Sequence, residues 1–248
     1  MVDPAQRVPR YVEIADELRS RIDGGAFDAD GKLPSEREMG EEFGVARGTI
    51  RDALQVLRAE DRIESRRGAG NFLRSFERVN RDVVARLSRS QWGAGRSIWD
   101  RDTGPRHQES VDIEKVSPPK RIAGVLGVYG QEVWRRQRVH QVAKRTVQQS
   151  TSWYPADLAE GTAITEPNTG PGGVYARLDE IGHGPARYRE EVMVRLPLPE
   201  EVATLGITLT TPVILVARTA FDDDDRPVEV NEMVLDADSF RLIYTFPS

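Results

Sequence analysis

The spacing of apolar residues in the first 60 positions predicts three helices. In residues 9–24, apolar side chains recur every three or four positions, and charged residues occupy the opposite face. A second, short helix is expected because Ser35 and Glu38 have the spacing of a capping box, and Gly44 suits the left-handed residue that ends a helix. A third helical pattern resumes almost at once and includes Ile50, so a tight turn is expected between the last two helices.

After the third helix the pattern changes to alternation. Two short runs, residues 62–65 and 71–74, flank the glycine-containing segment 66–70, which predicts a two-stranded hairpin. Three helices followed by a hairpin, with a tight turn between the second and third helices, is the order of a winged helix-turn-helix domain. We therefore expect such a domain in residues 1–75.

The second half of the chain has a different pattern, in which strand-like runs alternate with short helical segments. The expected strands are 109–116, 132–142, 146–153, 188–196, 213–221 and 227–235, and the expected helices are 118–127, 172–182 and 198–206. This pattern is typical of an α+β domain with a mainly antiparallel sheet, which we place in residues 96–248. Residues 76–95 show only a weak helical pattern, and we expect them to form a linker.

Composition limits the class of protein. The chain has 248 residues, enough for two domains, and 38% of them are hydrophobic, which excludes disorder throughout. It has no cysteine, which excludes disulfides and thiolate metal sites. No long apolar run and no signal-like N-terminal segment occur, so we expect a cytoplasmic protein without a membrane span.

Charge is distributed unevenly along the chain. The net charge of −5 argues against a protein that coats nucleic acid without specificity. Residues 46–75, however, contain seven arginines and four acidic residues, which gives this stretch a local charge of +3. Because the arginine fork pairs bidentately with phosphate or guanine, this charge favours contact with DNA through the third helix and the hairpin.

The first domain resembles the DNA-binding domain of GntR-type bacterial repressors. The resemblance rests on GKLPSERE at 31–38, VARGTIRDAL at 45–54 and GAGNF at 68–72. It implies a winged helix-turn-helix that binds a short inverted repeat. One departure is Ala46, which stands where the family usually has a capping serine and which costs the helix start about 1 kcal/mol.

Seven residues are candidates for contact with DNA. We expect Arg47 to read a base, because the N-terminal residues of a recognition helix reach base edges and arginine pairs with guanine. Thr49, Arg51 and Arg37 are expected to hold phosphates, which set the register of the protein on DNA. The alternative is that these arginines are only solvated. The full set is Arg37, Arg47, Gly48, Thr49, Arg51, Arg67 and Gly68.

The second half resembles the effector-sensing UTRA domain of the HutC-like subfamily of these repressors, whose fold is similar to that of chorismate lyase. The resemblance rests on RQR at 136–138, SWYP at 152–155, GVY at 173–175 and DRPVE at 225–229. It implies a domain that binds a small-molecule effector. A single reading helix needs two copies to recognise a symmetric operator, so we also expect a homodimer.

Two arginines are the main candidates for effector binding. Arg136 and Arg138 lie two positions apart on an expected strand, so both side chains point to one face. Two guanidinium groups on one face repel each other unless an anion lies between them. That anion is either a ligand or a carboxylate from a neighbouring strand. The resemblance places effector binding at the same positions and adds Ser152, Tyr175 and Glu229.

Other features of the second half give weaker signals. The run Asp222–Asp225 lies between two expected strands and is better explained by a solvated turn than by a cation site. The three histidines have no spacing typical of metal ligands, although His183 is close enough to Tyr175 in sequence to line a pocket. The four tryptophans fit either a ligand-binding wall or core packing. We expect no metal, no cofactor and no catalytic residue.

Three hypotheses about function follow. The main one is a homodimeric transcriptional repressor that binds a double-stranded DNA operator. Its affinity for the operator depends on a small, anionic effector. The second is a constitutive DNA-binding repressor, as in plasmid control, with a degenerate sensing domain. The third is a lyase-like enzyme, for which no catalytic set can be named in the sequence.

Overall fold

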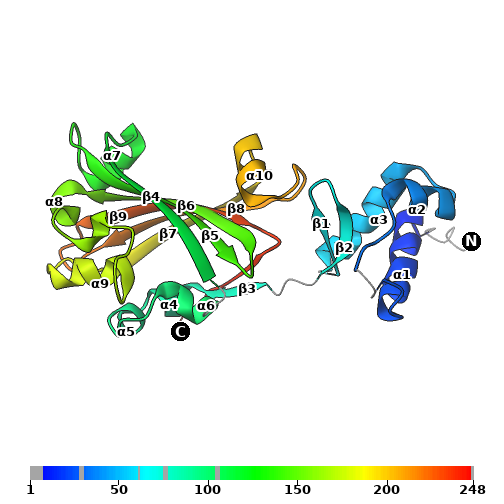
Figure 1. The fold of residues 1–248 in the computed structure, drawn as a ribbon, viewed down its shortest axis with the longest axis horizontal. Coiled ribbons are helices and arrows are strands. Elements are labelled where there is room, and N and C mark those ends of the chain that lie inside the picture. The colour runs from blue at the N-terminus through cyan, green and yellow to red at the C-terminus, as the bar shows by residue number, and fades with distance from the viewer. Residues whose placement is uncertain (1–7, 28–30, 61, 75–77, 104–106, 247–248) are drawn as a thin grey trace, which may run out of the picture. The chain divides into compact units, whose positions relative to one another are not determined.

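The computed structural model describes residues 8–27, 31–60, 62–74, 78–103 and 107–246. The chain divides into two compact units, residues 1–77 and 78–248 (Figure 1). Both the winged helix-turn-helix and the α+β architecture expected from the sequence are confirmed.

The first unit contains three helices and a hairpin, in the expected order. The helices are α1 (Arg10–Asp23), α2 (Glu36–Phe43) and α3 (Arg47–Ala59), and the strands of the hairpin, called the wing below, are β1 (Ile63–Arg66) and β2 (Gly70–Leu73). The two strands pair antiparallel, with Arg66 opposite Gly70. Apolar side chains from all three helices and β1 form one core, which includes Leu18, Met39, Leu54 and Ile63.

Local interactions fix both ends of α2 and the turn that leads into α3. Ser35 Oγ accepts a hydrogen bond from the Glu38 amide at 3.3 Å, and the Ser35 amide donates to Glu38 Oε2 at 2.8 Å, so the predicted capping box is present. Gly44 ends α2 with φ of 63°, a value that favours glycine. A Cβ on Gly40 would lie 3.1 Å from the Val45 carbonyl oxygen, so a small residue lets the turn close tightly.

The second unit is built on a six-stranded antiparallel sheet with the order β4-β5-β6-β9-β8-β7. All six predicted strands form, with bounds that differ from the prediction by a few residues. They are β4 (His107–Val116), β5 (Val133–Val142), β6 (Arg145–Pro155), β7 (Arg187–Arg195), β8 (Val213–Phe221) and β9 (Pro227–Asp236).

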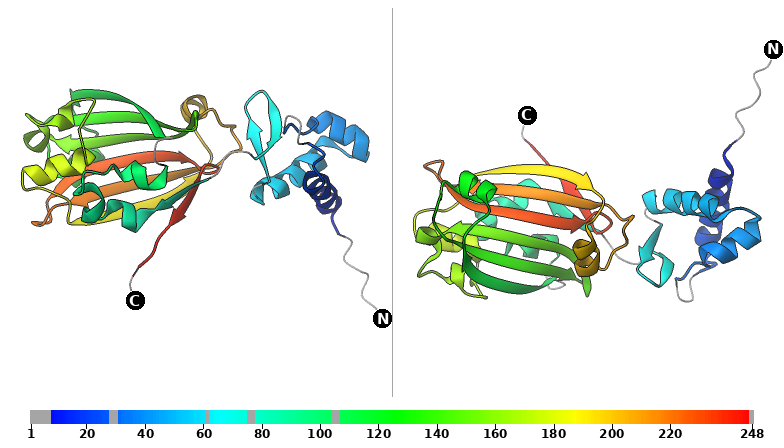
Figure 2. Two further views of the ribbon diagram at one scale, coloured as in Figure 1. Left: turned by 60° about the horizontal axis from the view of Figure 1, so that its bottom comes forward. Right: turned by 90° about the horizontal axis from the view of Figure 1, so that it is seen from above.

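Helices cover both faces of this sheet (Figures 1 and 2). The outer face packs against α7 (Lys120–Leu126) near Trp153 and against α10 (Pro199–Leu205) near Val213. The opposite face, called the inner face below, carries the side chains of Arg136 and Ser152. The elements near the inner face are β3 (Val79–Asp82), α4 (Val83–Leu87), α5 (Arg89–Trp92), α6 (Ile98–Asp102), α8 (Ala156–Ala159), η2 (Ala163–Thr165), α9 (Gly173–Glu180) and β10 (Phe240–Ile243).

Much of the expected linker is part of the second unit. Residues 79–92 form β3, α4 and α5 instead of a connecting segment, and β3 pairs in parallel with β10. The reason is that the few apolar residues of this stretch pack onto the domain core. Trp92 is fully buried, and its Nε1 donates to the Leu87 carbonyl at 3.0 Å. The second unit therefore begins at Arg78 rather than at residue 96.

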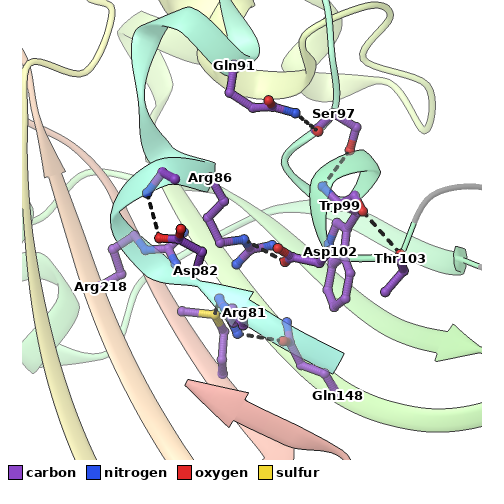
Figure 3. A network of polar contacts seen from close by, with 12 residues as sticks. Arg81, Asp82, Arg86, Gln91, Ser97, Trp99, Asp102, Thr103, Gln148 and Arg218 are labelled. Carbon is purple, nitrogen blue, oxygen red and sulfur yellow. Dashed lines mark hydrogen bonds and ion pairs between the residues drawn. The ribbon is translucent and has the colours of Figure 1, made fainter. Parts of the chain in front are cut away.

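Buried charges fix this segment to the inner face (Figure 3). Arg86 Nε lies 2.8 Å from Asp102 Oδ2, and both side chains are 1% exposed. Arg81 Nη1 donates to Gln148 Oε1 on β6 at 3.1 Å. Burial lowers the pKa of Arg86 to about 10, although the charge of Asp102 opposes that effect.

Among the helices of the described ranges, none is long and apolar enough to cross a membrane.

Replacement of Asp102 by alanine should destabilise the second unit by about 3–5 kcal/mol, because it leaves the buried charge of Arg86 uncompensated. The measurement is urea unfolding followed by tryptophan fluorescence, since all four tryptophans lie in this unit. The control is Glu160→Ala, which removes an exposed ion pair with Lys115 and should cost less than about 1 kcal/mol. Equal losses in the two variants would contradict the role given to the buried pair.

Candidate functional site

The start of α3 presents an arginine that has no ion-pair partner among the residues that the structure describes. The helix begins at Arg47, and its N-cap residue Ala46 makes no side-chain hydrogen bond, as the sequence predicted. Ile50 and Leu54 face the core, whereas Arg47 is exposed and forms no ion pair with any residue in the described part of the chain. Arg51 follows four residues later and therefore lies on the same side of the helix as Arg47.

Two other candidate arginines are held by carboxylates. Arg51 Nε donates to Glu36 Oε2 at 2.7 Å, which ties α3 to the first turn of α2. Arg37 Nη1 donates to Glu41 Oε1 at 2.7 Å within α2. Exposed pairs of this kind contribute little to stability, and they leave the guanidinium groups accessible to a stronger anion such as phosphate.

The tip of the wing presents a second arginine of this kind. Arg67 is exposed and, within the described ranges, has no ion-pair partner. Gly68 follows it with φ of 70°, a conformation that a residue with a side chain adopts with strain. By contrast, the Arg66 guanidinium lies over the Phe72 ring at 4.4 Å and pairs with Glu64, so it helps to build the wing.

Gly48 and Thr49 lie in the first turn of α3. Thr49 is half-buried, and its amide donates to the Ala46 carbonyl at 3.0 Å. A Cβ built on Gly48 would meet nothing within 4 Å, so no packing inside the unit requires a glycine there. Because Gly48 has no side chain, the start of the helix can approach another molecule closely.

In the second unit, two of the candidate residues belong to a row of polar side chains across the inner face. Arg136 lies opposite Ser152, Ser152 opposite Asn231, and Asn231 opposite Arg218 on four neighbouring strands. Side chains at directly opposed positions share one face of a sheet. All four residues are buried, with exposures of 6% or less, so the row forms a polar layer inside the domain.

Arg136 is held by main-chain oxygens. Its Nη1 donates to the carbonyls of Ile164 at 2.6 Å and Glu166 at 2.5 Å, and its Nη2 donates to that of Pro167 at 3.2 Å. Burial lowers the pKa of Arg136. The sequence left a carboxylate and a ligand as possible partners, and the structure instead uses Arg136 to hold the segment around η2.

Arg138 has fewer partners. Its Nη2 donates to Ser152 Oγ at 2.6 Å, and its Nε is buried and has no hydrogen-bond acceptor among the described residues. No carboxylate of the described residues forms an ion pair with it. A half-buried guanidinium with a buried, unused donor is the kind of group that binds an anion.

Glu229 is saturated by two tyrosines. Tyr154 donates to its Oε1 at 2.6 Å, and Tyr175 donates to its Oε2 at 2.7 Å. Burial, followed by the charge of Glu229, raises the pKa of Tyr154, so this hydroxyl remains a donor at neutral pH. The structure thus brings Tyr175 and Glu229 together and adds Tyr154 to them.

Sequence reasoning missed Arg218 and Asn231. Arg218 Nε donates to Glu190 Oε1 at 2.7 Å, and its Nη1 lies 3.4 Å from the Tyr175 hydroxyl. Arg218 is the one charged residue within β8, and alternation from the buried Val216 places it on the inner face, so the signal was present. Asn231 carries a buried Oδ1 that has no partner in the described part of the chain, which no sequence pattern reveals.

The remaining candidates have structural partners. His183 Nδ1 lies 2.7 Å from Asp222 Oδ2, and Asp222 Oδ1 accepts hydrogen bonds from the amides of Asp224 and Arg226, so these residues organise the β8–β9 turn. The tryptophans do not form one wall. Trp153 packs with α7 on the outer face, whereas Trp92 lies edge-on to Tyr175 at 6.2 Å near the inner face.

Family models match both units. Residues 10–73 match the family described as bacterial regulatory proteins of the gntR family, and residues 107–241 match the UTRA domain. The UTRA match alone spans more than half of the chain.

Full-length relatives and solved structures agree with these matches. The chain is 26% identical to the mannosyl-D-glycerate transport/metabolism system repressor MngR of Escherichia coli, with 94% of each chain covered. It is 24% identical to the repressor NagR of Bacillus subtilis, over 96% of this chain and 94% of NagR.

A crystal structure assigned to a GntR-family transcriptional regulator is 29% identical, with a TM-score of 0.61 over 97% of this chain and 98% of the other. PhnF of Mycobacterium smegmatis, at 24% identity and a TM-score of 0.58 over 95% and 99%, shares the fold. The chain therefore belongs to the GntR family and is a DNA-binding transcriptional regulator in which a winged helix-turn-helix precedes an effector-sensing UTRA domain.

Proposed function

We propose that this regulator is a homodimeric repressor whose affinity for its operator changes when a small anion binds beside Arg138 on the inner face. The observation that carries the proposal is that Arg138 lacks partners for its charge and for one of its donors. It is bonded to one neutral hydroxyl, its Nε has no acceptor, and within the described chain no carboxylate pairs with it. A bound carboxylate or phosphate would supply the missing acceptor and the missing charge.

The neighbouring groups limit the ligand further. Asn231 Oδ1 is a buried acceptor that receives no hydrogen bond from the described residues, and it lies two strands away from Arg138 on the same face. Glu229 has both oxygens occupied by tyrosines and does not need a ligand to satisfy it. The ligand that completes this site therefore carries an anionic group together with a hydroxyl or amino donor.

The first unit supplies the operator contacts. Arg47 is exposed and unpaired within the described residues, which leaves its fork available for a guanine. Arg37, Thr49 and Arg51 then serve as phosphate contacts. The tip of the wing adds Arg67 and Gly68. In the first turn of α3, Gly48 allows a close approach of the helix to DNA. Because each chain has one such helix, we expect two chains on an inverted repeat.

The effector acts by changing populations. A ligand shifts the balance between DNA-competent and DNA-incompetent forms only to the extent that it binds them with different affinity. The relatives MngR and NagR are named repressors, which supports release of an operator as the response to the ligand.

The test is selection of binding sites from a random pool of duplex DNA near physiological salt. Enrichment of one inverted repeat, bound far more tightly than a scrambled sequence, would support a dimeric sequence-specific repressor and would supply the probe for a screen of organic acids and sugar phosphates. An operator that no compound in the screen releases would favour the constitutive repressor instead. Failure to enrich any site would contradict the proposal.

Substitution of Arg47 by alanine should weaken binding to the selected operator by about 1–3 kcal/mol and relax the preference at one base pair of each half-site, because it removes a base contact. Fluorescence anisotropy with the operator and its single-base variants measures both effects. Arg10→Ala, an exposed α1 residue paired with Glu13, serves as the matched control. Unchanged affinity and base preference in the Arg47 variant would exclude the base-reading role.

Replacement of Arg138 by methionine should abolish release of the operator by the ligand found in the screen, while affinity for DNA in its absence stays within about threefold of wild type. The reason is that the charged donor for the ligand is lost, whereas the operator contacts lie in the other unit. The control is Arg135→Met on the same strand, whose guanidinium pairs with Asp112 and Glu114. If the Arg138 variant responds to the ligand as wild type does, the site is elsewhere.

A further inference from the structure

We propose that the second unit has a further ligand site, a groove between α4, β7 and residues 244–246, and that this groove binds an apolar amine. The groove has a volume of about 750 Å³. That size lies within the range of sites for small organic molecules. The proposal concerns a different part of the domain from Arg138 and does not depend on the anion proposed to bind there.

The walls of the groove are mainly apolar. Val83 and Leu87 of α4 line it and are buried, with exposures of 4% and 6%. Tyr188 of β7 lines the same groove. Tyr244 and Phe246, which follow β10, remain 40% and 72% exposed, and their rings stack with centroids 6.2 Å apart. An apolar body thus has both aliphatic and aromatic surfaces to contact.

One carboxylate oxygen in the groove is only weakly bonded. The Glu190 side chain, which lines the groove, is 9% exposed. Its Oε1 accepts from Arg218 Nε at 2.7 Å, whereas its Oε2 accepts, among the described residues, only from the Tyr244 hydroxyl at 3.3 Å. A hydroxyl normally approaches an acceptor oxygen to about 2.7–2.8 Å, so Oε2 remains available to a stronger donor. Burial raises the pKa of Glu190, but the charges of Arg218 and Arg81 outweigh burial and lower it, so the group is ionised at neutral pH.

The free charge of the lining is negative. Asp223 lies exposed at the rim and forms no ion pair with any residue of the described ranges. Among the described residues that line the groove, the cationic one is Arg89, and Asp179 already holds its guanidinium. The groove therefore has a favourable potential for a positive charge and an unfavourable one for a negative charge.

These features select an apolar amine over other classes of ligand. An ammonium group is a charged donor, and its hydrogen bond to Glu190 Oε2 would be shorter and stronger than that of the tyrosine hydroxyl. The faces of Tyr244 and Phe246 also attract cations. A carboxylate or phosphate would be repelled by Glu190 and Asp223, whereas an uncharged apolar compound would leave Oε2 weakly bonded.

The groove is separate from the candidate effector site. Arg138 lies on β5, and the strands β6, β9 and β8 separate β5 from β7 in the sheet. At the usual spacing of strands, the backbones of β5 and β7 are about 19 Å apart along the sheet. Arg218 nevertheless links the two regions, because it contacts both Glu190 and the Tyr175 hydroxyl.

Titration of the full-length protein with three compounds that share one apolar body tests the class of ligand. The probes are tryptamine, tryptophol and indoleacetate, which carry a cation, a neutral hydroxyl and an anion. In isothermal titration calorimetry, tryptamine should bind at least about tenfold more tightly than tryptophol, because only the amine forms a charged hydrogen bond. Indoleacetate should not displace tryptamine. No binding of tryptamine at millimolar concentration, or equal affinities for the amine and the alcohol, would overturn the proposal.

A matched pair of charge variants tests the rim. Asp223→Lys should weaken tryptamine binding at least about tenfold, because it reverses the free charge beside the groove. Asp224→Lys makes the same change in the same exposed turn but outside the lining, so near physiological salt it should weaken binding less than about threefold. Equal losses in the two variants would mean that the acidic turn attracts cations without a site, which would overturn the proposal.

A second pair of variants tests the aromatic wall. Tyr244→Ala should also weaken tryptamine binding, because it removes an aromatic surface from the groove. The control is Tyr129→Ala, which removes a tyrosine that is 73% exposed and lies outside the groove. All four substituted residues are exposed, so near-identical melting temperatures should show that folding is not the cause of the losses.

Two further outcomes would place the amine or the groove differently. Tryptamine affinity that is unaffected by both Asp223→Lys and Tyr244→Ala would show that the amine binds elsewhere, which overturns the site. Tryptamine binding that occurs only when the protein is diluted to a monomer would show that a second copy covers the groove, and the proposal would fail for that reason.

Discussion

Burial of positive charge between the sheet and the segments that cover its inner face is the constraint on which the second unit depends. The arginines that are fully buried there are Arg81, Arg86, Arg136 and Arg218. Two of them face carboxylates, one is held by main-chain carbonyls and one by Gln148 and Met233. Since an uncompensated buried charge costs several kcal/mol, each partner must stay in place for the domain to keep this form.

These partners come from segments that are distant in sequence. Asp102 lies on α6, Glu190 lies on β7, and the carbonyl oxygens that hold Arg136 lie around η2. One polar layer therefore positions three separate parts of the chain. The proposed ligand would add a negative charge to the same layer beside Arg138. The segment that follows the DNA-binding unit contributes Arg81 and Arg86 to this layer.

Local patterns in the sequence predicted most of the architecture. Alternating strands, the capping box at Ser35 and the left-handed Gly44 depend on neighbours in the chain, and the structure confirms them. The segment 79–92 was misjudged because its apolar residues are too sparse to form a periodic face and pack against distant strands. The carbonyl cage around Arg136 was equally hidden, since main-chain orientation in a remote loop leaves no trace in side-chain identity.

The pairing of β3 with β10 has a consequence for protein engineering. The first strand of the second unit is completed by one of its last, so the two ends of this domain are joined by backbone hydrogen bonds. A hybrid regulator that exchanges reading heads must therefore be spliced before Arg78 and must retain the chain through Ile243. A junction at residue 96, where sequence pattern alone would place it, would remove Trp92 and leave β10 without its partner strand.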